Sequence, residues 1–201
     1  MDYQNIDKIN VERWYKTAIV TGKTSAEKVG WSSTYNQQVR FKVLSGIGNL
    51  NNKSVLDFGC GLAEFYPYLK SIYPKIIYTG MDFIEEYIIK DRIRFPEVNF
   101  ILGDSTNLTQ NYDYILTSGV FSYKIEQSEK RYKQTIKHLC SYSRIAFGAN
   151  FLLRGKHIDN SVYNTWDPQE LLEWAKKISP KVEIINDYLA HDFTLFLYNN
   201  G

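Results

Sequence analysis

The sequence predicts an α/β protein with a doubly wound sheet of seven strands, mostly parallel, that closes with an antiparallel C-terminal strand. Five short apolar runs alternate with helix-period segments between residues 54 and 149, a pattern typical of a parallel sheet covered by helices. Two further strand-like runs, 181–188 and 193–198, have too short a connection for a crossover helix. We therefore expect these last two strands to be antiparallel.

The individual elements follow from apolar periodicity and from capping residues. Asp167 is expected to cap a helix that has Pro168 in its first turn. The expected strands are 54–58, 76–82, 98–102, 112–117, 144–149, 181–188 and 193–198, and the expected helices are 6–20, 34–47, 62–72, 84–93, 125–139 and 168–178. In the helix over 34–47 the expected buried face is Val39, Val43, Leu44 and Ile47, and residues 21–28 are expected to form a polar loop.

One domain is expected over residues 1–201, with residues 1–48 as an N-terminal helical cap and residues 49–201 as a Rossmann-like core. No segment approaches the roughly 20 apolar residues of a membrane helix. The net charge of +2, from 24 basic and 22 acidic side chains, gives no concentrated basic face for nucleic acid. Cys60 and Cys140 form no metal-type pair, so we expect reduced thiols, a cytoplasmic location and no metal.

The most informative segment is the glycine-containing turn after the first strand, Val55-Leu56-Asp57-Phe58-Gly59-Cys60-Gly61-Leu62-Ala63-Glu64. Glycine at such a turn permits unusual backbone angles and close approach of a ligand, and the following helix offers free amide donors. Asp82 lies 23 residues after Gly59, at the end of the next strand. Nucleotide-binding folds place there a carboxylate that accepts hydrogen bonds from ribose hydroxyls.

This turn resembles motif I of the class I S-adenosylmethionine-dependent methyltransferases, which has the pattern acid-x-Gly-x-Gly-x-Gly. Asp57, Gly59 and Gly61 match the pattern, and Ala63 replaces its third glycine. The terminal antiparallel pair strengthens the resemblance, which covers residues 50–198. A dinucleotide dehydrogenase would instead show Gly-x-Gly-x-x-Gly and a sheet that continues parallel.

The resemblance implies S-adenosylmethionine as the cofactor, with S-adenosylhomocysteine as its product, and a set of positions that bind it. Gly59, Cys60 and Gly61 border its methionine half, and Asp57 holds the amino group. Asp82 binds the ribose and Phe83 lies beside the adenine. Asp104, followed by Ser105, faces the adenine amino group or instead only caps a local helix, and Ser118 lies under the sulfonium. Arg40 or Tyr35 meets the cofactor carboxylate, unless their helix only packs on the sheet.

Acceptor residues are expected beyond the carboxyl ends of the strands. The candidates are Tyr123 and His191 for catalysis, and Asn150, His157 and Tyr188 for substrate binding. His191 is the preferred base because an unperturbed imidazole titrates near pH 6.5, and Asp192 would orient it. The alternative is a solvent-exposed histidine in a hairpin turn.

The function expected from these features is methylation, on oxygen or nitrogen, of a small polar metabolite or a saccharide precursor, with no nucleic-acid partner. Three alternatives stay open at this stage. They are a nucleic-acid or protein methyltransferase, a non-catalytic cofactor-binding or partner-binding protein, and an aminopropyl-transfer enzyme on the same scaffold.

Overall fold

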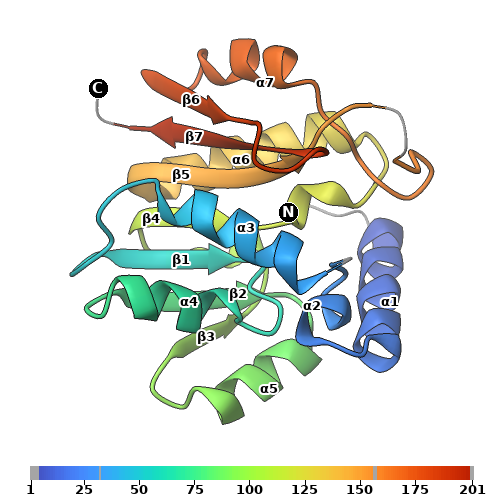
Figure 1. The fold of residues 1–201 in the computed structure, drawn as a ribbon, viewed down its shortest axis with the longest axis vertical. Helices are drawn as coiled ribbons and strands as arrows, with labels where there is room; N and C mark the ends of the chain where they lie inside the picture. The colour runs from blue at the N-terminus through green and yellow to red at the C-terminus, as the bar shows by residue number, and fades with distance from the viewer. Residues whose placement is uncertain (1–4, 32, 156–157, 200–201) are drawn as a thin grey trace.

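A computed structural model describes residues 5–31, 33–155 and 158–199. Its strands form one seven-stranded sheet in the order β3-β2-β1-β4-β5-β7-β6 (Figure 1). Strand β7 is antiparallel to both β5 and β6, and the other pairs are parallel. The expected fold class is confirmed, including the reversal at the last strand.

The bounds of the elements agree closely with the sequence periodicity. The strands are β1 Ser54–Phe58, β2 Ile77–Asp82, β3 Asn99–Leu102, β4 Tyr112–Thr117, β5 Ser143–Leu152, β6 Lys181–Ile185 and β7 Asp192–Tyr198. The helices are α1 Asn5–Thr21, α2 Ser25–Lys28, α3 Thr34–Ser45, α4 Phe65–Ile72, α5 Glu85–Arg94, α6 Ser128–Tyr142 and α7 Pro168–Ala175, with 3-10 turns η1 Ser105–Asn107 and η2 Val120–Ser122.

Three expectations about helices and strands were wrong. The expected polar loop 21–28 contains helix α2, because Thr24 and Glu27 form a capping box at its start. Strand β5 continues to Leu152 since its last residues pair with the start of β7. Strand β6 is shorter than expected and ends at Ile185. The expected cap at Asp167 is present, because its Oδ1 accepts hydrogen bonds from the backbone N–H groups of Gln169 and Glu170.

Alternating residues of the central strands face two separate cores. Val55 of β1 packs with helices α3, α4 and α5, whereas its neighbour Leu56 packs with α6 and α7. The same alternation separates Tyr114 from Ile115 in β4. Figure 1 shows α3 and α4 in front of the sheet and α6 behind it. This period of two is what places helices on both faces of the sheet.

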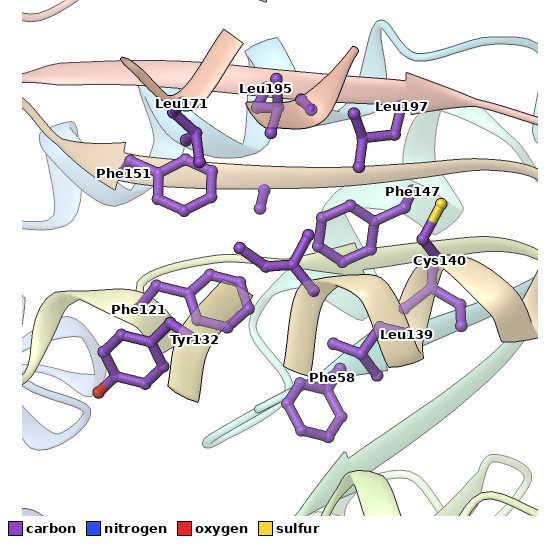
Figure 2. Close-up of a cluster of buried hydrophobic side chains, with 14 of the residues drawn as sticks. Phe58, Phe121, Tyr132, Leu139, Cys140, Phe147, Phe151, Leu171, Leu195 and Leu197 are labelled. Atoms are coloured by element: carbon purple, nitrogen blue, oxygen red, sulfur yellow. The ribbon is translucent and has the colours of Figure 1, made fainter. Parts of the chain in front are cut away.

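The core on the α6 side is built from aromatic and branched side chains of β5, β7, α6 and η2 (Figure 2). Phe147 and Tyr132 are fully buried there, and Phe151 is stacked against Phe121 with ring centroids 5.5 Å apart. Replacing a buried phenylalanine such as Phe147 by alanine costs about 3–5 kcal/mol. This core therefore fixes β4 and β5, whose carboxyl ends reach the site described below.

The face expected to be buried over 34–47 is confirmed at Leu44 and Ile47, but helix α3 also buries other residues. Gln37, Arg40 and Phe41 are buried together with Leu44, whereas Val39 and Val43 are only partly buried. A buried arginine needs a partner, and Arg40 finds one in a distant strand. In the described part of the chain, no helix is long and apolar enough to cross a bilayer.

Candidate active site

The carboxyl ends of β1, β2, β3 and β4 open into one cavity of about 950 Å³. Helices α1 and α2 and the first half of α3 contribute the opposite wall, and α1 stands beside these strand ends in Figure 1. Cofactor and small-molecule sites have volumes of roughly 300–1,000 Å³. The cavity is therefore at the upper end of that range, and it lies where ligands bind in open α/β sheets.

The glycine turn after β1 lines this cavity with Gly59, Cys60 and Gly61. Gly59 and Gly61 have positive φ angles of 76° and 56°, a region that disfavours side chains. A Cβ at Gly59 would lie 2.2 Å from Val120 Cγ2. The turn therefore needs glycine for its own packing as well as for access to the cavity.

Two buried carboxyl groups lie beside this turn. The Oδ2 of Asp82 accepts a hydrogen bond from the Gly61 N–H at 2.9 Å, and its Oδ1 accepts one from the Ile84 N–H at 2.9 Å. The Tyr78 hydroxyl donates to Asp57 Oδ2 at 2.5 Å. Burial raises the pKa of Asp57 to about 7 and that of Asp82 to about 6, because a dry environment disfavours the charged form. Both side chains line the cavity.

The third strand end has two features that sequence alone left as alternatives. Asp104 lines the cavity, and its Oδ1 also accepts a hydrogen bond from the Thr106 N–H at the start of η1. It is therefore a local cap that also faces the ligand space. Phe83 lines the cavity as well, whereas Ser105 is buried and not part of its wall.

Arg40 and Tyr35, the two candidates for a cofactor carboxylate, have different positions. Tyr35 is 71% exposed and is not part of the cavity wall. Arg40 lines the cavity, and its Nη2 donates to both oxygens of Asp192 at 2.7 and 2.6 Å. Its guanidinium also lies over the Trp31 ring, 4.2 Å from the centroid. The Nη1 of Arg40 is buried without a hydrogen-bond partner, which is costly unless a ligand supplies an acceptor.

Asn150 and Tyr188 belong to a hydrogen-bond network behind the cavity wall. The Asn150 Nδ2 donates to Thr194 Oγ1 at 2.7 Å, and the Ser118 hydroxyl donates to Asn150 Oδ1 at 3.0 Å. The Tyr188 hydroxyl lies 2.9 Å from the Thr194 hydroxyl. Of these four side chains, only Ser118 lines the cavity.

His191 and Tyr123 both line the cavity, which brings the two catalytic candidates to one site. His191 is also exposed to solvent. The expected support from Asp192 takes another form, since both oxygens of Asp192 bind Arg40. His157 lies outside the described residues. Among those residues no cluster of side chains with metal-ligand chemistry is found.

Sequence reasoning missed an aromatic wall that comes from the cap and from a late loop. Trp14 and Tyr15 of α1, Trp31 before α3, and Tyr163 before α7 all line the cavity. No short motif marks these positions. The only signal in the sequence was the abundance of aromatic residues, 15% of the chain.

Comparisons with known proteins agree with this arrangement. The methyltransferase domain family matches residues 49–173. No curated protein matches the chain by sequence. The fold resembles that of the N-methyltransferase NodS from Bradyrhizobium japonicum WM9, solved with S-adenosylhomocysteine, at a TM-score of 0.72 and 12% identity, with 96% of this chain and 100% of that chain covered.

Two further solved structures show the same fold. One is the 1,6-didemethyltoxoflavin-N1-methyltransferase of Burkholderia thailandensis, with a TM-score of 0.70, 13% identity, and coverage of 98% of this chain and 91% of that chain. The other is the magnesium protoporphyrin IX methyltransferase of Synechocystis PCC 6803, with a TM-score of 0.67 and 15% identity. The match covers 97% of this chain and 96% of that chain. Since the family match spans more than half of its residues, the chain belongs to the methyltransferase domain family and is an S-adenosylmethionine-dependent methyltransferase, as the glycine turn after β1 indicated.

Proposed function

We propose that this protein transfers the methyl group of S-adenosylmethionine to a small polar metabolite, such as a saccharide precursor, on oxygen or nitrogen. The observation that carries the proposal is one continuous cavity of about 950 Å³, which joins the glycine turn to the space around Tyr123 and His191. The cavity is large enough for a cofactor and a small second molecule. The acids in its wall disfavour a polyanionic acceptor, and the unpaired cysteines suit a cytoplasmic protein.

The side chains in this wall fit the cofactor at three points. The unpartnered Nη1 of Arg40 suits its carboxylate. The carboxyl groups of Asp57 and Asp82 suit its amino group and its ribose hydroxyls, respectively. When bound, the cofactor supplies an electrophilic methyl group on a positively charged sulfonium.

The protein's own contribution to the reaction is alignment of the acceptor with that methyl group. Direct displacement gains much of its rate from the positioning of the two reactants. Helix α1 supports this role, because its residues form one wall of the cavity. It is held to α6 by an ion pair between Asp7 and Arg131 at 2.6 Å and to α5 by Lys16 and Glu86 at 3.0 Å. His191 lies at the solvent side, where a histidine is suited to take a proton from a hydroxyl acceptor.

Isothermal titration calorimetry tests the cofactor assignment. S-adenosylmethionine and S-adenosylhomocysteine are expected to bind with micromolar affinity, and NAD is expected not to bind. Asp82→Asn should weaken binding roughly 5- to 150-fold, which corresponds to a lost charged hydrogen bond of about 1–3 kcal/mol. Absence of binding by either sulfur ligand would overturn the proposal.

The matched control is Asp91→Asn. Asp91 is also a buried acid near the glycine turn, where the Cys60 thiol donates to its Oδ2 at 3.8 Å, but it does not line the cavity. Its variant should bind the cofactor like the unmodified protein. A panel of small metabolites, assayed by release of S-adenosylhomocysteine, then tests transfer itself. Turnover only with RNA or protein substrates would contradict the small-molecule assignment.

A further inference from the structure

Four aromatic side chains from three separate segments meet at one end of the cavity. They are Trp14 and Tyr15 of α1, Tyr123 after η2, and Tyr163 before α7, and together they are called the aromatic chamber here. The ring centroid of Trp14 lies 4.8 Å from that of Tyr15 and 5.8 Å from that of Tyr123. Tyr123 and Tyr163 are joined by an antiparallel β-bridge. Tertiary contacts therefore hold all four rings around the same space.

Carboxylates flank this chamber on two sides. Asp82 is close enough to Tyr15 for its charge to raise the pKa of the phenol, to which burial contributes most. Asp159 lines the cavity at its solvent side. Hydrogen bonds from the hydroxyl and the backbone N–H of Ser161 hold the pKa of Asp159 below its usual value, so this carboxylate stays ionised.

The positive charge of Arg40 in the cavity wall is balanced by Asp192. Among the described residues that line the cavity, Arg40 is the one arginine and no lysine occurs. Arg40 is paired with Asp192 and stacked on Trp31. Ring faces and carboxylates without a cationic partner both attract cations, so the potential in the chamber favours a positively charged group.

We propose that the methyl acceptor is an amine, which the aromatic chamber and its flanking carboxylates bind in the ammonium form. This inference rests on the proposed methyltransferase function and narrows it to methylation on nitrogen. The rings of Trp14, Tyr15, Tyr123 and Tyr163 contact the alkyl groups and the charge of the ammonium, as in aromatic sites for quaternary amines. Asp82 and Asp159 supply the long-range attraction.

The chemistry balances without a further reactant. The ammonium first gives one proton to solvent, because only the neutral amine has a free electron pair. The nitrogen then forms a bond to the methyl carbon as the carbon–sulfur bond breaks, and that bonding pair stays on sulfur. The product is a methylated ammonium ion, which keeps its remaining protons and its positive charge. Since the product carries the same charge as the bound substrate, one chamber suits both.

A pair of isosteric probes separates charge from shape. The first probe is choline, and the second is its neutral isostere 3,3-dimethylbutan-1-ol, in which a carbon atom replaces the nitrogen. The two molecules have nearly the same size and the same hydroxyl group. Their affinities for the protein saturated with S-adenosylhomocysteine are measured by NMR titration. Choline should bind about tenfold more tightly, the factor expected for a cation–π contribution of about 1.4 kcal/mol. Equal affinity, or no binding of choline at its highest soluble concentration, would overturn the inference.

Matched variants locate the effect. Tyr15→Leu and Tyr123→Leu should lose the preference for choline, whereas Tyr15→Phe and Tyr123→Phe should keep most of it because the rings remain. Tyr35→Leu is the control, since Tyr35 is an exposed tyrosine outside the cavity. A preference unchanged by the two leucine variants would also overturn the inference. Binding of S-adenosylhomocysteine is measured on each sample, so a failure of the methyltransferase assignment is distinguished from a failure of the amine assignment alone.

Discussion

Asp91, a buried acid beside the glycine turn but outside the cavity wall, allows a sharp test of how burial changes the ionisation of carboxyl groups in this protein. It lies in α5, is 1% exposed, and its Oδ1 has no hydrogen-bond partner. Burial, with the nearby charges of Asp82 and Asp57, raises its pKa to about 8. The perturbation is Asp91→Asn, which keeps the shape of the protonated acid and removes the charge.

The sign of the effect follows from proton linkage. In the unfolded chain the Asp91 carboxyl ionises near pH 3.9, whereas in the folded protein it stays protonated up to about pH 8. Between these values the unfolded state binds fewer protons, so the free energy of unfolding falls as the pH rises. In this window, each increase of one pH unit lowers the free energy of unfolding by about 1.4 kcal/mol. From about pH 5 to about pH 7 the unmodified protein should therefore lose about 2–3 kcal/mol relative to Asp91→Asn.

Urea unfolding measured at several pH values between about 5 and 8 tests this expectation. The stability of Asp91→Asn should approach or exceed that of the unmodified protein as the pH rises. Glu85→Gln is the control, because Glu85 is an exposed acid on the same helix, and it should shift the curve without changing its slope. A constant difference between Asp91→Asn and the unmodified protein over the whole range would show that Asp91 is ionised in the fold, which refutes the reasoning.

Three other substitutions should change the free energy of unfolding, which thermal or chemical unfolding measures. Arg40→Leu should cost about 3–5 kcal/mol because it leaves the buried Asp192 unpaired, and adding Asp192→Leu should recover part of that loss; strictly additive losses would contradict the pairing. Gly59→Ala should destabilise the fold by at least the left-handed strain of about 1–2 kcal/mol, and Val120→Ala should relieve part of the added clash but not the strain. Gln127→Gly should stabilise by about 0.5–1 kcal/mol, since the relief of strain at φ 52° exceeds the added chain entropy; a loss of stability would show that the backbone is not strained there.

Most of the fold was predictable because patterns among neighbouring residues indicate its strands and helices. The apolar runs at 54–58 and 112–117, each followed by a segment of helical periodicity, indicate buried strands from neighbouring residues alone. The errors occurred where a boundary depends on a partner far away. Strand β5 extends to Leu152 because β7 pairs with it, and β7 lies about 40 residues further along the chain.

The residues of the candidate site also fall into a group that the sequence predicts and a group that it does not. Gly59, Gly61 and Asp82 lie at the ends of neighbouring parallel strands, so their convergence follows from the topology alone. Arg40 meets Asp192 across 152 residues, a pairing that no local pattern encodes. The same limit applies to Tyr15 and Tyr163, which face the cavity only because the cap and a loop fold over the strand ends.

The buried acids connect the stability of this protein to its function. Asp57, Asp82 and Asp91 all have raised pKa values, because burial disfavours their charges and the charges of Asp82 and Asp57 oppose ionisation of Asp91. Such a cluster is unfavourable in the free protein at neutral pH. In the complex proposed above, the ammonium group of S-adenosylmethionine lies beside Asp57 and adds positive charge there, which favours the ionised form of Asp57. We therefore propose that cofactor binding recovers the free energy that the burial of Asp57 costs the free protein, so that the affinity for the cofactor and the stability of the free protein both depend on this acid.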